Sequence, residues 1–529
     1  MKRQSLETIH LDKIVGGGQA LGTLADGRKC FVWGGLPGET VTVRITKKKS
    51  YFVEAIVEEV VSPSPDRIQP RDPDSYLSTS PWQIMPLEVE QTYKAQLIDD
   101  AFALHNVTLP AAIDVYCNNV VYGYRNKVEF SWYSESVVSR AVSQKEPGAV
   151  SGPGLFSDNN QEIDADSDRE ESSGDTLDLA FFRRGSKGKI VVDGTSLAHP
   201  AINNLARAIR DLLRHKRVTA RQLKTLLVRC DQSGSCVWQL YVKDRLPEII
   251  TADEAAKLPA QGGEIIYSDP RSPASRITER LALFGNTTLT DAILDIPFRY
   301  ACEGFFQVNI PVYEQALRDM RQWMSHSRSD NQQRVISQKK SGQHRESKQH
   351  GSSNSFSEGF AFPAKARQER QLDQLAARRP EEKDVCETGE SALDLYAGVG
   401  TIGLTIGGGN VTLVEINADA VREMQRNIAE LDRTDACAVL APSEQALDYI
   451  TGKEIVIVDP PRAGLHPDVV ATLLQKLPPR IIYLSCNPVT QARDVALLQQ
   501  NYRIVHHRGY NFFPRTPHIE HLIILDKKP

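Results

Sequence analysis

One cysteine, Cys486, stands between a strand-like run and a polar, helix-like stretch in the segment Ser485-Cys486-Asn487-Pro488. A residue at the carboxyl end of a strand lies at the edge where open α/β sheets bind ligands. The thiolate is the reactive form of cysteine, and a following helix N-terminus lowers the thiol pKa from roughly 8.5. The segment therefore predicts that Cys486 is an activated nucleophile. By itself it leaves open the alternative of an inert core cysteine.

A glycine-rich segment, Gly398-Val399-Gly400-Thr401-Ile402-Gly403, follows another strand-like run and opens a helix-like one. Small residues there let backbone amides approach a ligand, and a helix N-terminus favours electron-rich groups. Glu415 ends the next strand-like run, where an acidic residue can bind ribose hydroxyls. The pattern predicts a nucleotide-type cofactor and leaves its identity open, because a dinucleotide site has the same spacing.

Two acidic residues complete the candidate site. Asp459 ends a strand-like run and precedes Pro460-Pro461, whose missing N–H groups and fixed φ angles make a rigid turn. Amino-methylating enzymes place an aromatic residue after a similar turn, and the presence of Arg462 argues against that chemistry. Glu520 precedes the last strand-like run and is the candidate general base.

No metal site is predicted. His518 and Glu520 resemble the histidine–glutamate pair of zinc deaminases, but that class needs paired cysteines two residues apart, which the sequence lacks. Cys230 and Cys236 flank a Ser-Gly-Ser turn and are expected to form a hairpin.

The elements that must position these residues are predicted by an alternation of strand-like and helix-like runs after about residue 391. The strand-like runs cover residues 392–396, 411–414, 455–458, 481–485, 503–506 and 521–525. Such alternation is typical of a doubly wound, mostly parallel sheet. We therefore expect a C-terminal Rossmann-like domain over residues 301–529.

The preceding sequence is richer in β-structure, so the whole chain is predicted to be a multidomain α/β protein. Residues 1–62, with alternating valines between glycine-marked turns, predict a small β-barrel, and residues 63–300 a central α+β domain. Lys47-Lys48-Lys49 beside Tyr51 and Phe52 suits single-stranded nucleic acid, although a solvated hairpin tip is the alternative. Two polar insertions, 134–178 and 325–389, are predicted to be disordered.

Composition sets further limits. The chain has 529 residues, 40% hydrophobic content and a formal net charge of −4, which gives no overall sign of nucleic-acid binding. It has neither a signal peptide pattern nor an apolar run long enough to span a membrane. Its eight cysteines do not make a disulfide scaffold in a chain of this length. We expect a cytoplasmic protein, and a monomer.

Taken together, the motifs resemble the RNA uracil-5-methyltransferase family, and in particular its bacterial members that act on 23S ribosomal RNA. The N-terminal region resembles the TRAM domain, an oligonucleotide-binding-type (OB-like) barrel, and Tyr124-Arg125-Asn126-Lys127 resembles a family signature. The resemblance implies transfer of a methyl group from S-adenosylmethionine to C5 of uridine, with Cys486 as the nucleophile and Glu520 as the base. The cofactor-binding residues that it implies, together with the glycines of the loop, are Gln307, Tyr396, Gly398, Gly400, Thr401, Glu415 and Asp459.

The sequence departs from the family at two places. Many TRAM-bearing relatives hold an iron–sulfur cluster through four cysteines, whereas Asp72, Ser78, Pro81 and Ser196 stand at those positions here. Thiolates hold such clusters, so none is expected. Asn511 stands where the resemblance implies an aspartate.

The substrate implied is RNA, with ribosomal RNA preferred and transfer RNA as the alternative. A cytosine-5-methyltransferase would carry its cysteine in the turn at Asp459-Pro460-Pro461, and none stands there. An NAD-dependent oxidoreductase would leave Cys486 and Glu520 without roles. A catalytically silent RNA-binding protein is a further alternative, against which the intact nucleophile and base argue.

Overall fold

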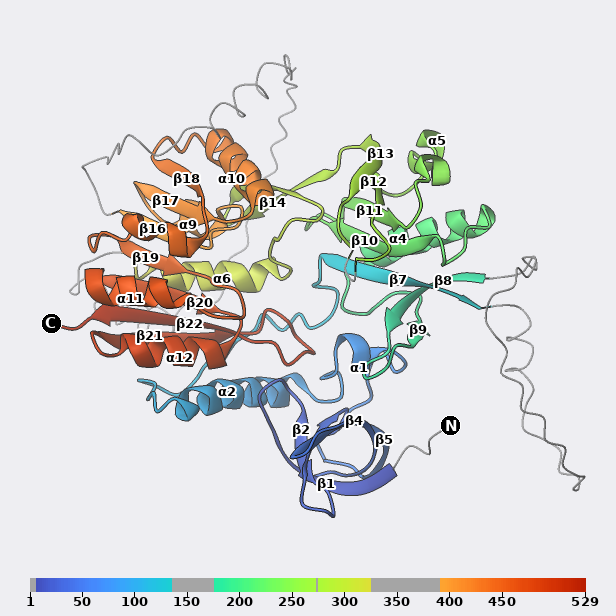
Figure 1. Ribbon diagram of the computed structural model, residues 1–529, viewed down its shortest axis with the longest axis horizontal. Coiled ribbons are helices and arrows are strands. Elements are labelled where there is room, and N and C mark those ends of the chain that lie inside the picture. The colour runs from blue at the N-terminus through green and yellow to red at the C-terminus, as the bar shows by residue number, and fades with distance from the viewer. Residues whose placement is uncertain (1–5, 136–175, 273–274, 325–390) are drawn as a thin grey trace, which may run out of the picture.

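The computed structural model describes residues 6–135, 176–272, 275–324 and 391–529. Figure 1 shows a small barrel at the N-terminus, a central antiparallel-rich sheet and a C-terminal sheet covered by helices on both faces. The predicted multidomain α/β class, with its N-terminal barrel and C-terminal doubly wound sheet, is confirmed. None of the described helices is long and apolar enough to cross a membrane.

The N-terminal strands close into a barrel in the order β1-β2-β3-β5-β4. Its core forms because alternate side chains, such as Val41 and Val43 of β4, turn inward while their neighbours face solvent. The strands are β1 (Leu6–Ile14), β2 (Ala20–Thr23), β3 (Lys29–Trp33), β4 (Thr40–Lys48) and β5 (Phe52–Ser62).

The central sheet has the order β13-β12-β11-β10-β7-β8-β9, and helix α4 (Pro200–His215) packs on one face through Ile202, Leu205 and Ile209. Cys230 pairs with Cys236 across β10 and β11, which confirms the predicted hairpin. The strands are β7 (Lys127–Glu135), β8 (Thr176–Phe182), β9 (Lys189–Val191), β10 (Leu223–Cys230), β11 (Cys236–Val242), β12 (Gly262–Tyr267) and β13 (Glu279–Gly285). The short helices α1 (Tyr76–Thr79) and α5 (Ala252–Ala255) and the turn η1 (Pro247–Ile249) lie in this part of the chain.

The prediction of disorder over 134–178 was wrong at both margins. Ser134 ends β7 with Glu135, and Thr176-Leu177-Asp178 begins β8, because Leu177 and Leu179 alternate with polar residues and bury against α4. Residues 136–175 and the second insertion, 325–389, lie outside the described residues.

The C-terminal sheet has the order β18-β17-β16-β19-β20-β22-β21-β6. It is parallel from β18 to β20, and β22 is antiparallel to both β20 and β21. The strands are β6 (Val115–Tyr116), β16 (Ala392–Leu395), β17 (Val411–Glu415), β18 (Ala436–Leu440), β19 (Ile455–Val458), β20 (Arg480–Ser485), β21 (Tyr502–Tyr510) and β22 (Glu520–Lys527).

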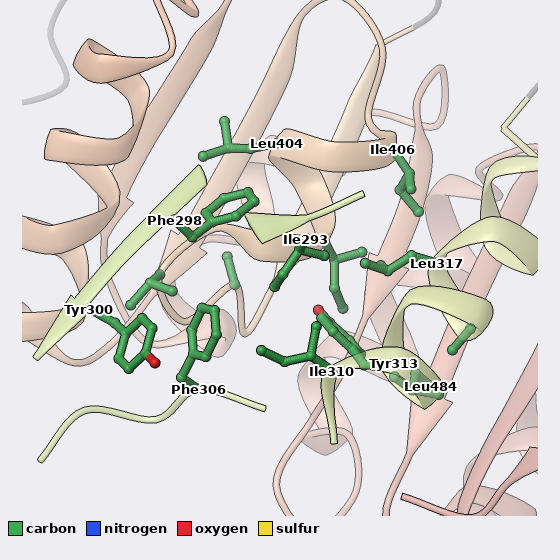
Figure 2. Close-up of a cluster of buried hydrophobic side chains, with 14 of the residues drawn as sticks. Ile293, Phe298, Tyr300, Phe306, Ile310, Tyr313, Leu317, Leu404, Ile406 and Leu484 are labelled. Carbon is green, nitrogen blue, oxygen red and sulfur yellow. The ribbon is translucent and has the colours of Figure 1, made fainter. Parts of the chain in front are cut away.

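Helices cover both faces of this sheet. On one face lie α6 (Ile310–Arg321), α9 (Thr401–Ile406) and α10 (Ala418–Glu430), together with the hairpin of β14 (Thr288–Ile293) and β15 (Ile296–Ala301). Figure 2 shows Phe298, Phe306 and Tyr313 meeting Leu404 and Leu484 in this core. On the other face lie α2 (Leu87–Leu104), α11 (Pro467–Lys476) and α12 (Pro488–Leu498), with the turns η2 (Ser443–Gln445) and η3 (Leu447–Tyr449) nearby.

Two segments from before residue 120 belong to the C-terminal layer. Strand β6 pairs with β21, and Ile98 and Phe102 of α2 are buried with Val495 of α12. We propose domain divisions after residues 62 and 300. Although α2 and β6 precede the second division, they pack with the C-terminal sheet.

Candidate active site

The register of two strands brings Cys486 and Glu520 together. In the antiparallel pair of β20 and β22, Ser485 lies opposite His521. Cys486 follows Ser485 and Glu520 precedes His521, so the two side chains stand at the same edge of the sheet. This is also the edge at which parallel strands β16 and β19 end, where α/β folds bind ligands.

The structure reverses the pKa shift predicted for Cys486. Asn487 does cap α12, its side chain accepting a hydrogen bond from Val489 N at 3.3 Å. Burial, however, raises the pKa of the Cys486 thiol to about 11, and the carboxylates of Glu520 and Asp459 add to this, while Arg462 opposes it. The prediction of a lowered pKa was wrong because it considered the helix and neither the burial of the thiol nor the acidic residues brought in from other strands.

The two carboxyl groups of the site also have raised pKa values. Burial raises the pKa of Asp459 to about 7. Burial, and then the charge of Asp459, raise the pKa of Glu520 well above 4.5, whereas Arg462 lowers it. Titratable groups shifted by burial and by a like charge are typical of sites that transfer protons.

Arg462 is the cation of this cluster. Its backbone carbonyl accepts hydrogen bonds from Asn487 Nδ2 at 2.8 Å and Thr490 Oγ1 at 3.2 Å, which fix the Asp459-Pro460-Pro461 turn to α12. Its guanidinium lies 3.4 Å from His518 Nδ1. Burial and nearby positive charges, Arg462 first among them, lower the pKa of His518 to about 4, so this imidazole is neutral at pH 7.

The glycine-rich loop is held by two acidic side chains. Asp394 in β16 is fully buried, and its Oδ2 accepts a hydrogen bond from Gly403 N at 2.8 Å. Its Oδ1 has no partner among the described residues, and burial raises the pKa of Asp394 to about 8. Glu415 accepts hydrogen bonds from Gly398 N at 3.0 Å and Asn417 N at 2.8 Å, so it ties the loop to the end of β17.

Two other predicted cofactor residues lie beside this loop. Thr401 Oγ1 lies 2.8 Å from the hydroxyl of Tyr313 in α6. Burial raises the pKa of Tyr313 well above 10, with further contributions from Asp459, Asp394 and Glu520, so this phenol also faces the site. Tyr396 has a left-handed backbone, with φ of +66°, and its side chain packs against the core on the α11 face.

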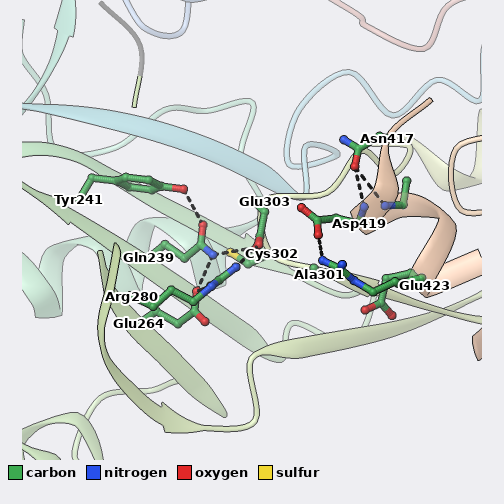
Figure 3. Close-up of polar contacts among 12 residues, drawn as sticks. Gln239, Tyr241, Glu264, Arg280, Ala301, Cys302, Glu303, Asn417, Asp419 and Glu423 are labelled. Atoms are coloured by element: carbon green, nitrogen blue, oxygen red, sulfur yellow. Dashed lines mark hydrogen bonds and ion pairs between the residues drawn. The ribbon is translucent and has the colours of Figure 1, made fainter. Parts of the chain in front are cut away.

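The segment that carries Gln307 is held by contacts with the central sheet. The Gln307 carbonyl accepts a hydrogen bond from Asn126 Nδ2 at 3.0 Å. Arg229, fully buried in β10, donates to the carbonyls of Gly304 at 2.5 Å and Phe306 at 3.0 Å, and stacks over Tyr300 at 4.6 Å. Glu303 is anchored by Gln239 and Arg280, as Figure 3 shows. These contacts position the segment that carries Gln307.

The segment before Glu520 is tied to α2 by a buried polar network. Lys94 Nζ contacts Glu90 Oε1 at 2.9 Å and donates to Asn511 Oδ1 at 2.5 Å. Asn511 Nδ2 donates to the same Glu90 oxygen at 2.9 Å, and Arg515 N donates to the Glu90 carboxylate at 3.0 Å. Asn511 therefore serves as both donor and acceptor between a lysine and a glutamate, which an ionised aspartate could not do.

The barrel reaches the same segment. A Cβ at Gly18 would lie 2.1 Å from Pro517 Cβ, so only glycine allows this approach. Trp82 strengthens the junction, donating through Nε1 to Gly18 O at 2.9 Å and through its backbone N to Arg515 O at 3.1 Å.

The sequence did not identify several residues of the site. Arg462 could have been found from its place after Asp459-Pro460-Pro461, and Asp394 from its place before the glycine loop. Tyr313, Lys94 and Arg229 gave no local signal, because each acts on a residue far away in the chain.

Comparison with known proteins agrees with this geometry. A family model described as tRNA (Uracil-5-)-methyltransferase matches residues 445–528, and a TRAM domain model matches residues 14–57. An RNA methyltransferase of Nitratidesulfovibrio vulgaris is 24% identical over 98% of this chain and 96% of its own length. The tRNA (uracil(54)-C(5))-methyltransferase of Pyrococcus abyssi is 43% identical over 25% of this chain and 32% of its own length.

These matches support an RNA uracil-5-methyltransferase family for this chain. The crystal structure of the Pyrococcus abyssi tRNA (uracil-54, C5)-methyltransferase with S-adenosyl-L-homocysteine has a TM-score of 0.66 and 17% identity, covering 98% of this chain and 100% of that one. That likeness shows a shared fold.

The positions compared with cluster ligands from the sequence, Asp72, Ser78, Pro81 and Ser196, carry no thiol. Ser196 Oγ donates to Asp72 Oδ2 at 2.7 Å, and Gln83 Nε2 donates to the same oxygen at 3.1 Å. Ser78 Oγ accepts a hydrogen bond from Arg184 N at 3.1 Å. These side chains supply oxygen rather than thiolate and are engaged with their neighbours, so they do not fit a cluster.

Proposed function

We propose that the protein methylates C5 of uridine in RNA, using S-adenosylmethionine and a covalent bond between Cys486 and C6 of the base. The observation that carries the proposal is the meeting of Cys486, Glu520, Asp459 and Arg462 at one sheet edge. A thiol beside two carboxyl groups of raised pKa can attack a base, and one of the two can then remove a proton from it.

The residues of the glycine loop fit the cofactor. The Gly398–Thr401 loop follows a parallel strand, Glu415 stands at the end of the next strand, and exposed Ile416 beside it offers an apolar surface for a purine. Asp394 Oδ1 and Asn309 Oδ1 are buried acceptors without partners among the described residues. Gln307, Tyr396, Gly398, Gly400, Thr401, Glu415 and Asp459 would hold S-adenosylmethionine, which when bound supplies an electrophilic methyl group.

The protein's own residues would act in a fixed order. The Cys486 thiolate adds to C6, and the electron pair displaced from the C5–C6 double bond makes C5 nucleophilic. After C5 is methylated, Glu520 takes the C5 proton, the double bond re-forms, and the Cys486–C6 bond breaks to release the thiolate. Cys486 needs its proton removed first, and the Arg462 cation favours the thiolate that forms.

Two RNA classes are candidate substrates. Resemblance to TRAM-bearing enzymes favours ribosomal RNA. The names of the Pyrococcus abyssi relative and of the family model favour transfer RNA, and the solved structure that shares this fold over 98% of the chain carries the same tRNA activity in its name. We also propose a cytoplasmic location, with which the free cysteines of the described residues accord, and a monomeric state.

The test is a labelled-methyl transfer assay with S-adenosylmethionine and total RNA from cells that lack this protein, followed by nucleoside analysis and size separation. We expect label in 5-methyluridine, and the size of the labelled RNA distinguishes ribosomal from transfer RNA. RNA binding without label would contradict the proposal and favour a silent RNA-binding protein.

A further inference from the structure

Two basic hairpin tips lie on one part of the molecule. The turn between β8 and β9 carries Arg183 and Lys187. The end of β4 and the turn that follows it carry Lys48, Lys49 and Tyr51. No acidic residue occurs in 181–189 or in 46–52, although the chain as a whole has a net charge of −4. We call these five residues the double-hairpin surface.

The two tips touch although they belong to different domains. A Cβ at Gly185, in the β8–β9 turn, would lie 3.0 Å from Thr46 Cγ2 and 3.0 Å from Ile56 Cδ1 of the barrel. Arg184 braces the contact, because its guanidinium lies 4.1 Å from the ring centre of Trp33. Its side chain also donates to the carbonyl of Leu77. The tips therefore keep a fixed relation to each other.

The cations of this surface are available to a ligand. Arg183, Lys187, Lys48 and Lys49 are exposed, and within the described part of the chain none forms an ion pair. Tyr51 between them is 86% exposed. Neighbouring basic residues are instead occupied: Lys47 contacts Glu54 at 2.8 Å, and Lys189 donates to Trp132 O at 2.6 Å.

Helix α4 shows what a merely solvated basic face looks like in this protein. Its Arg210 lies 2.5 Å from Asp193 and 2.9 Å from Asp211, and Arg214 pairs with Asp178 and Asp211. Those cations are neutralised by their own neighbours. Among the described residues no ion pair neutralises the cations of the double-hairpin surface, although the charge of Lys48 acts on Asp26, so an external polyanion is the ligand that the charge of this surface suits.

The surface is connected to the active site through the barrel. The barrel contacts Pro517 through Gly18, three residues before Glu520. The charge of Arg184, in the β8–β9 turn, contributes to lowering the pKa of His518, after the larger effects of burial and of three other cations. An RNA strand that enters the active site is therefore close to Arg184.

We propose that the double-hairpin surface binds the phosphate backbone of the substrate RNA outside the target uridine, with Tyr51 stacking on an unpaired base. The inference rests on the proposed function, since it assumes an RNA substrate. Exposed cations beside an exposed aromatic ring suit single-stranded RNA, and such binding is independent of base sequence.

The test compares Arg183→Gln/Lys187→Gln with a matched variant, Arg221→Gln/Lys257→Gln. The matched variant also removes two exposed cations, one just before β10 and one after α5. Binding of a fluorescent 30-nucleotide single-stranded RNA is measured over a series of salt concentrations, and thermal unfolding verifies that both variants fold. This readout needs no methylation.

We expect the hairpin variant to bind about tenfold or more weakly near ~0.1 M salt, with a log–log salt slope shallower by about 1.4, because each lost phosphate contact on a single strand removes roughly 0.7. The matched variant should stay close to wild type. Equal affinity and slope in the two variants would overturn the proposal. Tyr51→Ala should weaken binding without changing the slope, and a changed slope would contradict the stacking role.

Failure of the proposed function is distinguishable from failure of this inference. If the hairpin variant loses RNA binding but the wild-type protein does not methylate RNA, the proposed RNA-binding surface is retained and the proposed activity is rejected. If the hairpin variant binds RNA as well as the wild type does and the wild-type protein methylates RNA, the proposed activity is retained and the proposed RNA-binding surface is rejected.

Discussion

Glu90 and Glu520 are both buried, yet their surroundings differ in kind. Glu90 contacts Lys94 and accepts hydrogen bonds from Asn511 and the Arg515 backbone. Glu520, only 6% exposed, lies beside another carboxyl group, Asp459, with Arg462 as the opposing charge. A buried acid with every partner in place holds the fold together, whereas a buried acid beside a like charge is prepared to take up a proton.

The largest effect expected on the reactive region is that of Cys486→Ala. Because Cys486 would form the bond to C6, its loss should abolish methyl transfer to background in the labelled-RNA assay. Cys437→Ala is the matched control, since Cys437 is exposed on β18 and outside the site. Substantial turnover by the Cys486 variant would remove the covalent mechanism.

Glu520→Gln tests whether the buried acid beside Asp459 is the base. A glutamine cannot accept the C5 proton, so turnover should fall by about 10²–10⁴-fold, the usual contribution of a general base. A protein–RNA adduct that survives denaturing electrophoresis should accumulate. Turnover close to wild type, without an adduct, would assign proton removal to another group.

Lys94→Met tests the role of Glu90, the buried acid that contacts a lysine. It leaves Glu90 buried without its lysine, and removal of one partner from a buried pair costs about 3–5 kcal/mol. We expect this loss in the free energy of unfolding, measured by denaturant titration, with Lys453→Met, an exposed site, as control. A loss below about 1 kcal/mol would mean that the two acids do not differ as described.

The substitution Arg462→Met tests how the charges around the thiol act on the pKa of Cys486, and its expected effect is smaller. Arg462 lowers the pKa of Cys486 against burial and two carboxylates, so Arg462→Met should raise that pKa further. Less thiolate is then present at any pH below about 11, and alkylation by iodoacetamide should slow several-fold at pH 8.5. Arg462→Lys keeps the charge and should react at a rate nearer to wild type. Faster alkylation of the methionine variant would reverse the assigned sign.

The comparison of Glu90 and Glu520 also shows which features of the site the sequence could predict and which it could not. Asp459, Cys486 and Glu520 were found because each adjoins a recognisable strand, and strand ends of an α/β sheet meet at one edge. The pKa of Cys486 was misjudged because its main perturbers, burial and Glu520, arise only when β22 pairs with β20. Lys94 was missed for a related reason, since its partner Asn511 is 417 residues away.

The pairing of β6 with β21 has a consequence for how the chain is made. The catalytic sheet receives its edge strand from Val115–Tyr116, whereas its partner β21 (Tyr502–Tyr510) follows much later in the chain. The sheet therefore cannot be completed until β21 has been synthesised, and until then β6 has no strand to pair with. A fragment starting at residue 301 would leave β21 as a bare edge, which invites pairing between copies and aggregation. By pairing with β21, strand β6 therefore protects the edge of the catalytic sheet from pairing with another copy.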